Sequence, residues 1–210
     1  MASADFNRSV FVNCPFDHEY EPILQAMLFC IVFLGFTPRI ATERSDSGEN
    51  RLAKIKELIE SSRYSIHDLS RCQARTAGEH YRLNMPFELG LDYGCKAYFP
   101  AADRKKVLIL EEKPYRYQAA ISDLAGFDIE THEADYQVAV RKVRNWLANE
   151  ARGRSDGAGR ILDAYDDFQE WNYERQCAAG FSEDDILDYP TSELLTAMFD
   201  WTKAGRPASY

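Results

Sequence analysis

The first part of the chain alternates between short apolar runs and longer segments whose apolar residues recur at helical spacing. Five runs rich in β-branched and aromatic residues predict strands at residues 9–13, 36–42, 63–70, 105–112 and 127–133. Helices are predicted between or after them, at residues 18–34, 51–62, 86–95, 114–126 and 135–152. Such alternation predicts an α/β fold with a doubly wound, parallel, five-stranded sheet.

The helix predicted at residues 18–34 is apolar on nearly every side. Apolar residues fill the positions at helical spacing and also those between them, as in "MLFCIVF" at residues 27–33. A helix without a polar face is buried in a core or lies in an oligomer interface. The sequence leaves these two possibilities open.

The composition changes at "GRSDGAG", residues 153–159, which is typical of a linker. We therefore divide the chain into an α/β domain, residues 1–152, and a helical C-terminal extension, residues 153–210, with helices near 160–179 and 191–204. Apolar residues recur along the first of these helices at Ile161, Leu162, Tyr165, Phe168 and Trp171. The simpler interpretation is that this stripe packs on the sheet domain. The alternative is a surface for a partner or for self-association.

The net charge of −9 belongs almost entirely to the extension, since residues 155–210 alone carry −8. Neither part has the clustered Lys and Arg expected of a protein that binds duplex nucleic acid. Five widely spaced cysteines without a CxxC pair argue against disulfides and zinc, and we expect reduced thiols in a cytoplasmic protein without a metal. The most apolar stretch, residues 23–36, is too short to span a membrane.

Polar residues gather where the predicted strands end, and ligands of parallel α/β sheets bind at that edge. Candidates for binding are Asn13, Phe16, Asp17, Arg39, Ser70, Arg71 and Asn84, and the candidate catalytic carboxylates are Glu88 and Asp68. Separate loops would thus bring carboxylates, amides, an aromatic ring and arginines around one crevice.

Each candidate carboxylate has a structural and a functional interpretation. With Pro86 at the first helical position, Glu88 would lie in the first turn, where the helix dipole stabilises a carboxylate and keeps it ionised. That position serves stability, or it suits a nucleophile or an oxocarbenium stabiliser. Asp68, at a strand end, could cap the next loop or contact a ligand.

Three further features limit the possible chemistry. His67 and Asp68 are adjacent on a strand and should point to opposite faces, so we expect His67 to be structural. Cys14 has no obvious histidine partner and is expected to be a small buried residue. The chain contains no GxGxxG and no GxxxxGK[ST] motif, which disfavours dinucleotide-binding Rossmann folds and P-loops.

The segment "NMPFELGLDYG", residues 84–94, resembles the active-site segment of TIR-like nucleotide-binding proteins. It is also similar to the helix start of nucleoside 2-deoxyribosyltransferases. The resemblance extends over residues 9–146 and implies a flavodoxin-like sheet. Many bacterial TIR-like proteins are anti-phage effectors that cleave NAD+ at the nicotinamide bond, so the resemblance implies a substrate and no cofactor.

The resemblance also implies roles for single residues. Glu88 matches the glutamate that acts at C1′ of a ribosyl unit, and Asn84 matches the asparagine before it. Asp68 matches the D-x-S strand end, together with the serine two positions later, and Phe16 matches a loop aromatic that stacks on a base. Gly90, with Gly94 one turn later, would let this helix lie close to the sheet or to a ligand.

The leading hypothesis is that the protein is an N-glycosidase that hydrolyses a nucleotide in bacterial anti-phage defence or a stress response. NAD+ is the leading candidate for that nucleotide. Arg39 or Arg71 would meet a phosphate. One alternative is a non-catalytic TIR-like module that binds a nucleotide signal or a protein partner. A second alternative is a nucleoside 2-deoxyribosyltransferase or nucleoside hydrolase. The expected partners are a nucleotide or nucleoside ligand and either further copies of the chain or a partner protein of a defence system, without membrane attachment.

Overall fold

The computed structural model describes residues 5–71, 74, 76–78, 82–99, 105–119, 121–151 and 156–205. Five parallel strands form one sheet in the order β2-β1-β3-β4-β5. Their bounds are β1 Ser9–Asn13, β2 Thr37–Ile40, β3 Tyr64–Asp68, β4 Lys106–Glu111 and β5 Glu130–Thr131. This strand order is that of flavodoxin-like folds, and it confirms the predicted fold class.

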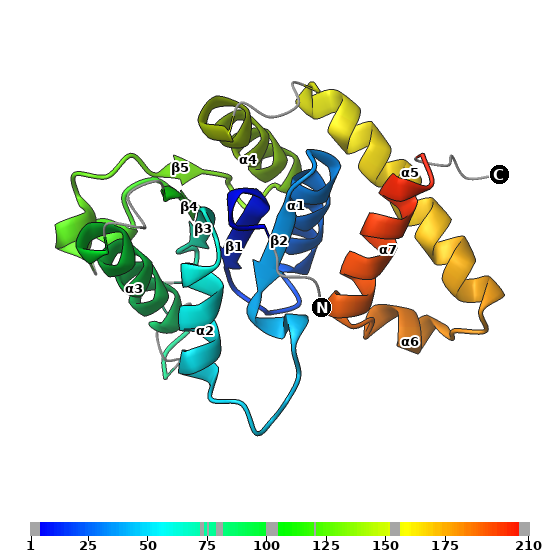
Figure 1. Cartoon of the computed structure of the whole chain (residues 1–210), viewed down its shortest axis with the longest axis horizontal. Helices are drawn as coiled ribbons and strands as arrows, with labels where there is room; N and C mark the ends of the chain where they lie inside the picture. The colour runs from blue at the N-terminus through cyan, green and yellow to red at the C-terminus, as the bar shows by residue number, and fades with distance from the viewer. Residues whose placement is uncertain are drawn as a thin grey trace.

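Helices cover both faces of the sheet (Figure 1). One face carries α1, Glu21–Phe33, and α4, Tyr136–Ala151, which pack on each other, and the other carries α2, Arg51–Glu60, and α3, Asn84–Tyr98. Every residue of the central strands β1 and β3 is buried, because a parallel sheet is covered on both sides. These four helices confirm predicted helices, with small shifts at their ends.

The apolar stripe of the extension packs on α1 of the same chain. The extension contains α5, Ala158–Ala178, α6, Glu183–Leu187, and α7, Thr191–Lys203. The ring of Phe29 lies 5.3 Å from the rings of Tyr165 and Phe168 and 5.6 Å from the ring of Trp201. A helix that is apolar all round is therefore buried between the sheet and the C-terminal helices (Figure 1).

The prediction of a helix at residues 114–126 is wrong. Two short 3-10 turns stand there, Tyr117–Ala119 and Ser122–Leu124. Tyr117 is buried in a small apolar cluster with Leu69 and Leu89, and this tertiary anchor decides the path of the segment. The fifth strand is shorter than predicted because it pairs only with the last two residues of β4.

Helix α3 differs from the prediction at its start and along its outer side. It begins at Asn84, two residues before Pro86, so Glu88 lies in the second turn rather than the first. The glycines do not permit close packing in this chain, because a Cβ at Gly90 or at Gly94 would meet no atom within 4 Å. The prediction that these glycines bring the helix close to the sheet is wrong, since the buried residues of α3 lie on its other side, whereas a close approach to a ligand stays a prediction.

Candidate functional site

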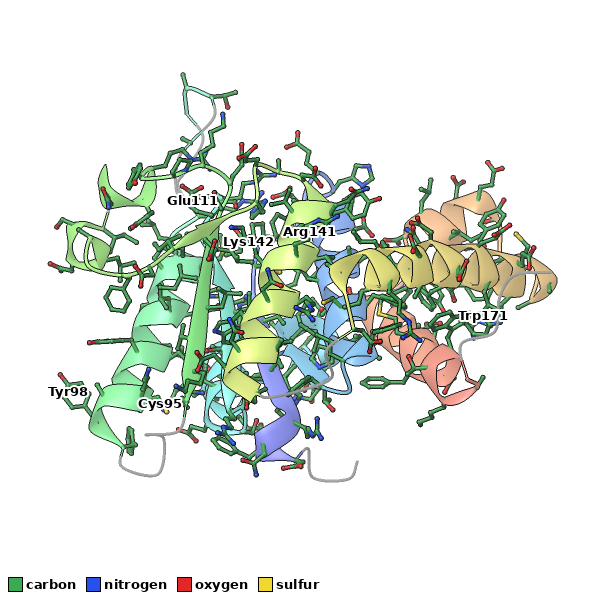
Figure 2. The ribbon with its side chains drawn as sticks, turned by 90° about the horizontal axis from the view of Figure 1, so that it is seen from above. Cys95, Tyr98, Glu111, Arg141, Lys142 and Trp171 are labelled. Atoms are coloured by element: carbon green, nitrogen blue, oxygen red, sulfur yellow. The ribbon has the colours of Figure 1, made fainter. Side chains whose placement is uncertain are left out.

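A cavity of about 300 Å³ opens at the carboxyl end of β1, between the loop after β1 and the starts of α2 and α3. Figure 2 shows Glu111, the last residue of β4, toward the upper edge of the α/β part and Tyr98, the last residue of α3, toward its lower edge. The start of α3 therefore lies toward the edge where the strands end. The cavity is lined by Asn13, Cys14, Pro15, Phe16, Arg51, Arg82, Leu83, Asn84, Met85 and Glu88. Four predicted residues, Asn13, Phe16, Asn84 and Glu88, thus meet in one place.

Glu88 combines burial with one weak ion pair among the residues that the structure describes. Its side chain is only 8% exposed, and its Oε1 lies 3.5 Å from Nη2 of Arg51. Burial raises the pKa of Glu88, and the charge of Arg51 opposes the rise without cancelling it. The position near a helix start does not lower the pKa of this carboxyl below its ordinary value, because burial has the larger effect. A carboxyl with a raised pKa can accept or donate a proton near neutral pH more readily than an ordinary glutamate.

Asn13 is held by a buried chain of polar groups. Its Nδ2 donates to the carbonyl of Met85 at 2.9 Å and to Nδ1 of His67 at 2.9 Å. Since Nδ1 of His67 accepts, the ring proton is on Nε2, which donates to Asp92 at 3.0 Å. Both amide hydrogens of Asn13 are thereby used within the protein, which leaves its oxygen as the acceptor that the side chain can offer to a ligand. His67 has the structural place that the sequence predicts.

Asp92 accepts from His67 and also pairs with a buried cation. Nζ of Lys105 lies 3.0 Å from Asp92, and both side chains are fully buried. Lys105 also donates to the carbonyls of Ile59 and Ser62, at 2.7 and 2.6 Å. Burial acts to raise the pKa of Asp92, but the hydrogen bond from His67 and the positive charge of Lys105 hold it at about 2. This ion pair therefore fixes α3 against β3 and β4.

Asp68 does not line the cavity with Glu88. It is fully buried on the other face of the sheet and accepts from Tyr20 Oη at 2.6 Å, from the Ser70 amide at 2.8 Å and from His132 Nε2 at 2.9 Å. The Ser70 hydroxyl also donates to it. Although burial acts to raise the pKa of Asp68, the bond from His132 and those from Ser70 and Tyr20 lower it. Alternation along β3 thus separates Asp68 from Glu88 and places His67 on the side of Glu88.

The remaining predicted residues lie outside the cavity as well. Nη2 of Arg39 lies 2.8 Å from Oε1 of Glu43, and the Arg39 side chain is only 13% exposed. Arg71 grips the carboxylate of Asp17 with two bonds of 3.1 Å. Ser70 and Arg71 line a separate hollow of about 80 Å³. Asp17, Arg39 and Arg71 therefore form ion pairs within the protein and do not line the cavity.

Sequence reasoning missed the two arginines that do line the cavity, Arg51 and Arg82. Arg51 is the first residue of α2 and follows Asn50, whose side chain caps the helix by accepting from the amide of Ala53. A capped helix start after a strand-end loop is a signal for the edge where ligands bind. That signal could have found Arg51, whereas Arg82 precedes α3 without a comparable mark.

A larger hollow, of about 550 Å³, lies beside β5 and is lined largely by residues 114–118 and 125–131. None of the predicted site residues lines it. Among the described residues, no group of three His, Cys, Asp or Glu side chains could hold a metal ion. The described helices include none with both the length and the apolar character needed to cross a membrane.

A comparison of the chain with protein-family models gives no match, and comparisons with curated proteins and with solved structures give none either. The cavity and the residues that line it are therefore the structural basis for a functional proposal.

Proposed function

We propose that the chain is an N-glycosidase of the TIR-like class that hydrolyses the bond between C1′ of a ribosyl unit and a nitrogen base, with NAD+ as the leading substrate. The observation that carries the proposal is Glu88, a buried carboxylate with a raised pKa at the wall of a cavity that also holds Phe16, Asn13 and Asn84. A cavity of about 300 Å³ is at the lower end of the range for ligand pockets and suits one base and its ribose.

The proposed reaction is a hydrolysis that needs no cofactor. The electrons of the C1′–N bond leave with nicotinamide, and the ionised carboxylate of Glu88 stabilises or attacks the positive charge that develops at C1′. Water then adds to C1′ and gives its proton to Glu88 or to solvent. Where Glu88 has formed a bond to C1′, the addition of water breaks that bond and returns the free carboxylate. The Asn13 oxygen and the Asn84 side chain would hold ribose hydroxyls, and Phe16, which is 42% exposed, would stack on the base.

Asp68 has an indirect role in this proposal. Its buried hydrogen bonds hold the loop after β3 and the start of α1 together. The resemblance places such an enzyme in the cytoplasm of a bacterium, in anti-phage defence, where it would work as an assembly of several copies or with a partner protein.

The direct test is incubation of the purified protein with NAD+ and, separately, with deoxynucleosides, followed by chromatography of the released base. We expect nicotinamide release, and we expect Glu88→Gln to lower kcat/KM by about 100-fold or more while the fold is kept. The matched control is Glu57→Gln on α2, an exposed glutamate paired with Arg44, which should leave the rate unchanged. Unaltered turnover in Glu88→Gln would overturn the proposal. The proposal would also fail if the protein consumed no substrate at high enzyme concentration and Glu88→Ala behaved like the wild type in cells.

A second candidate is a non-catalytic module that binds a nucleotide signal, and one observation favours it: Arg51 already lies against the carboxylate of Glu88. Calorimetry separates the two candidates, since a module binds NAD+ without consuming it and keeps its affinity in Glu88→Gln. The deoxynucleoside arm of the assay tests the transferase or nucleoside hydrolase alternative.

A further inference from the structure

Two arginines face the cavity from separate elements and remain largely exposed. The Arg51 side chain is 57% exposed and that of Arg82 is 46% exposed. Arg39 and Arg71, which lie outside the cavity, are 13% and 10% exposed. Of these four arginines, the two that line the cavity are the exposed ones.

The ion pairs of the two arginines are long and use a single contact. Nη2 of Arg51 lies 3.5 Å from Glu88, and Nη1 of Arg82 lies 3.5 Å from Asp17. Asp17 is already held by two bonds of 3.1 Å from Arg71. A guanidinium presents five donors in a planar fork, and one contact at 3.5 Å engages little of that fork. Both side chains are therefore suited to bind an incoming anion.

The charges of the cavity also favour an anion. Its lining contains two arginines and one glutamate, so it has a net positive charge when Glu88 is ionised. Arginine binds phosphate with paired hydrogen bonds, and such charge-assisted bonds are stronger than neutral ones. A phosphate on the ribose would thus find two charged donors at the wall that also carries Glu88.

We propose that Arg51 and Arg82 bind a phosphate group of the substrate, so that the site selects phosphorylated ribosyl compounds over nucleosides. The inference deepens the proposed function and, for the cleavage assay, rests on it. A phosphate that engages Arg51 draws it away from Glu88, so the same contact that anchors the substrate leaves the carboxylate available to C1′.

The test compares nicotinamide mononucleotide with nicotinamide riboside, which differ only in the phosphate. We expect the wild type to prefer the mononucleotide by about tenfold or more in kcat/KM. Arg51→Ala and Arg82→Ala should each lose most of that preference through a higher KM for the mononucleotide. Arg51→Lys should retain part of the preference, because it keeps the charge and loses the fork.

The matched control is Arg160→Ala, which removes an exposed arginine on α5 and should leave both substrates unaffected. Circular dichroism verifies that each variant is folded. An unchanged preference in the double variant Arg51→Ala/Arg82→Ala would overturn the inference.

A binding experiment decides the inference even if the protein cleaves nothing. Calorimetry with AMP and with adenosine should give tighter binding of AMP to the wild type and equal binding to the double variant. The phosphate site would be overturned if the wild type bound AMP and adenosine with equal affinity. It would also be overturned if the wild type bound neither of them. Failure of the proposed glycosidase would instead show as AMP binding without cleavage of any substrate.

Discussion

Glu88 and Asp68 are two buried carboxylates near the same edge of the sheet, and their surroundings differ sharply. Asp68 accepts hydrogen bonds from Tyr20, Ser70 and His132, and its pKa is lowered. Glu88 has one ion pair of 3.5 Å, and its pKa is raised. A fully bonded buried carboxylate supports the structure, whereas an incompletely bonded one beside a cavity is available for chemistry.

The strongest challenge to this comparison is Asp68→Ala. The substitution leaves the donors of Tyr20, Ser70 and His132 buried without their acceptor, so we expect a loss of about 3–5 kcal/mol in the free energy of unfolding. Denaturant titration measures the loss. Asp163→Ala, an exposed aspartate on α5, serves as the control and should change the stability by less than about 0.5 kcal/mol. A loss as small as in the control would mean that Asp68 is not a structural centre.

Asp92→Asn tests the buried chain beneath Asn13. The pKa of Asp92 is about 2, against an ordinary 3.8, so its charge stabilises the fold by about 2 kcal/mol at neutral pH. Because the folded-state pKa is depressed, this contribution is present above about pH 4 and is lost as the pH falls toward 2. Unfolding titrations from pH 7 to pH 3 should show the difference between wild type and variant shrinking. A difference that does not depend on pH would contradict the assignment.

Gly90 and Gly94 of α3 provide a comparison with positions that no described residue packs against. Gly90→Ala and Gly94→Ala should each stabilise the protein by up to about 1 kcal/mol, because alanine is the better helix former and its Cβ meets no atom. The same variants should cleave NAD+ at the wild-type rate. Destabilisation would indicate that another molecule or another copy of the chain lies against these glycines.

Glu88→Gln should have the smallest effect on stability, within about 1 kcal/mol and in the direction of greater stability at pH 7. A raised folded-state pKa means that the ionised carboxylate costs stability above that pKa and costs nothing below the ordinary value of 4.5. The advantage of the variant should therefore vanish near pH 4, as unfolding titrations at both pH values would show. A large loss of stability at pH 7 would place Glu88 in the same class as Asp68.

The fold could be predicted because its strands and helices carry local signals. Residues 107–110 are continuously apolar and are bounded by charged residues, and α4 repeats Val140, Val143 and Leu147 on one buried side. Residues 114–126 could not be predicted in the same way, because the burial of Tyr117 depends on Leu69 and Leu89, which are distant in the chain. Local propensity decides a segment only where tertiary contacts agree with it.

The site could be predicted only in part. Alternation along β3 separates His67 from Asp68, but it does not say which face carries the cavity. That depends on the packing of α3 beside His67, through Asp92. The pKa of Glu88 and its contact with Arg51 depend on how α2 approaches α3, and no local pattern records that distance. The division into residues 1–152 and 153–210 stays a prediction.

The packing of Phe29 against Tyr165, Phe168 and Trp201 has a consequence for any shortened version of the protein. A chain cut before α5 would present the aromatic side of α1 to water, and such a surface promotes aggregation. Expression for biochemistry, or fusion to a reporter, should therefore retain everything through Lys203, the end of α7.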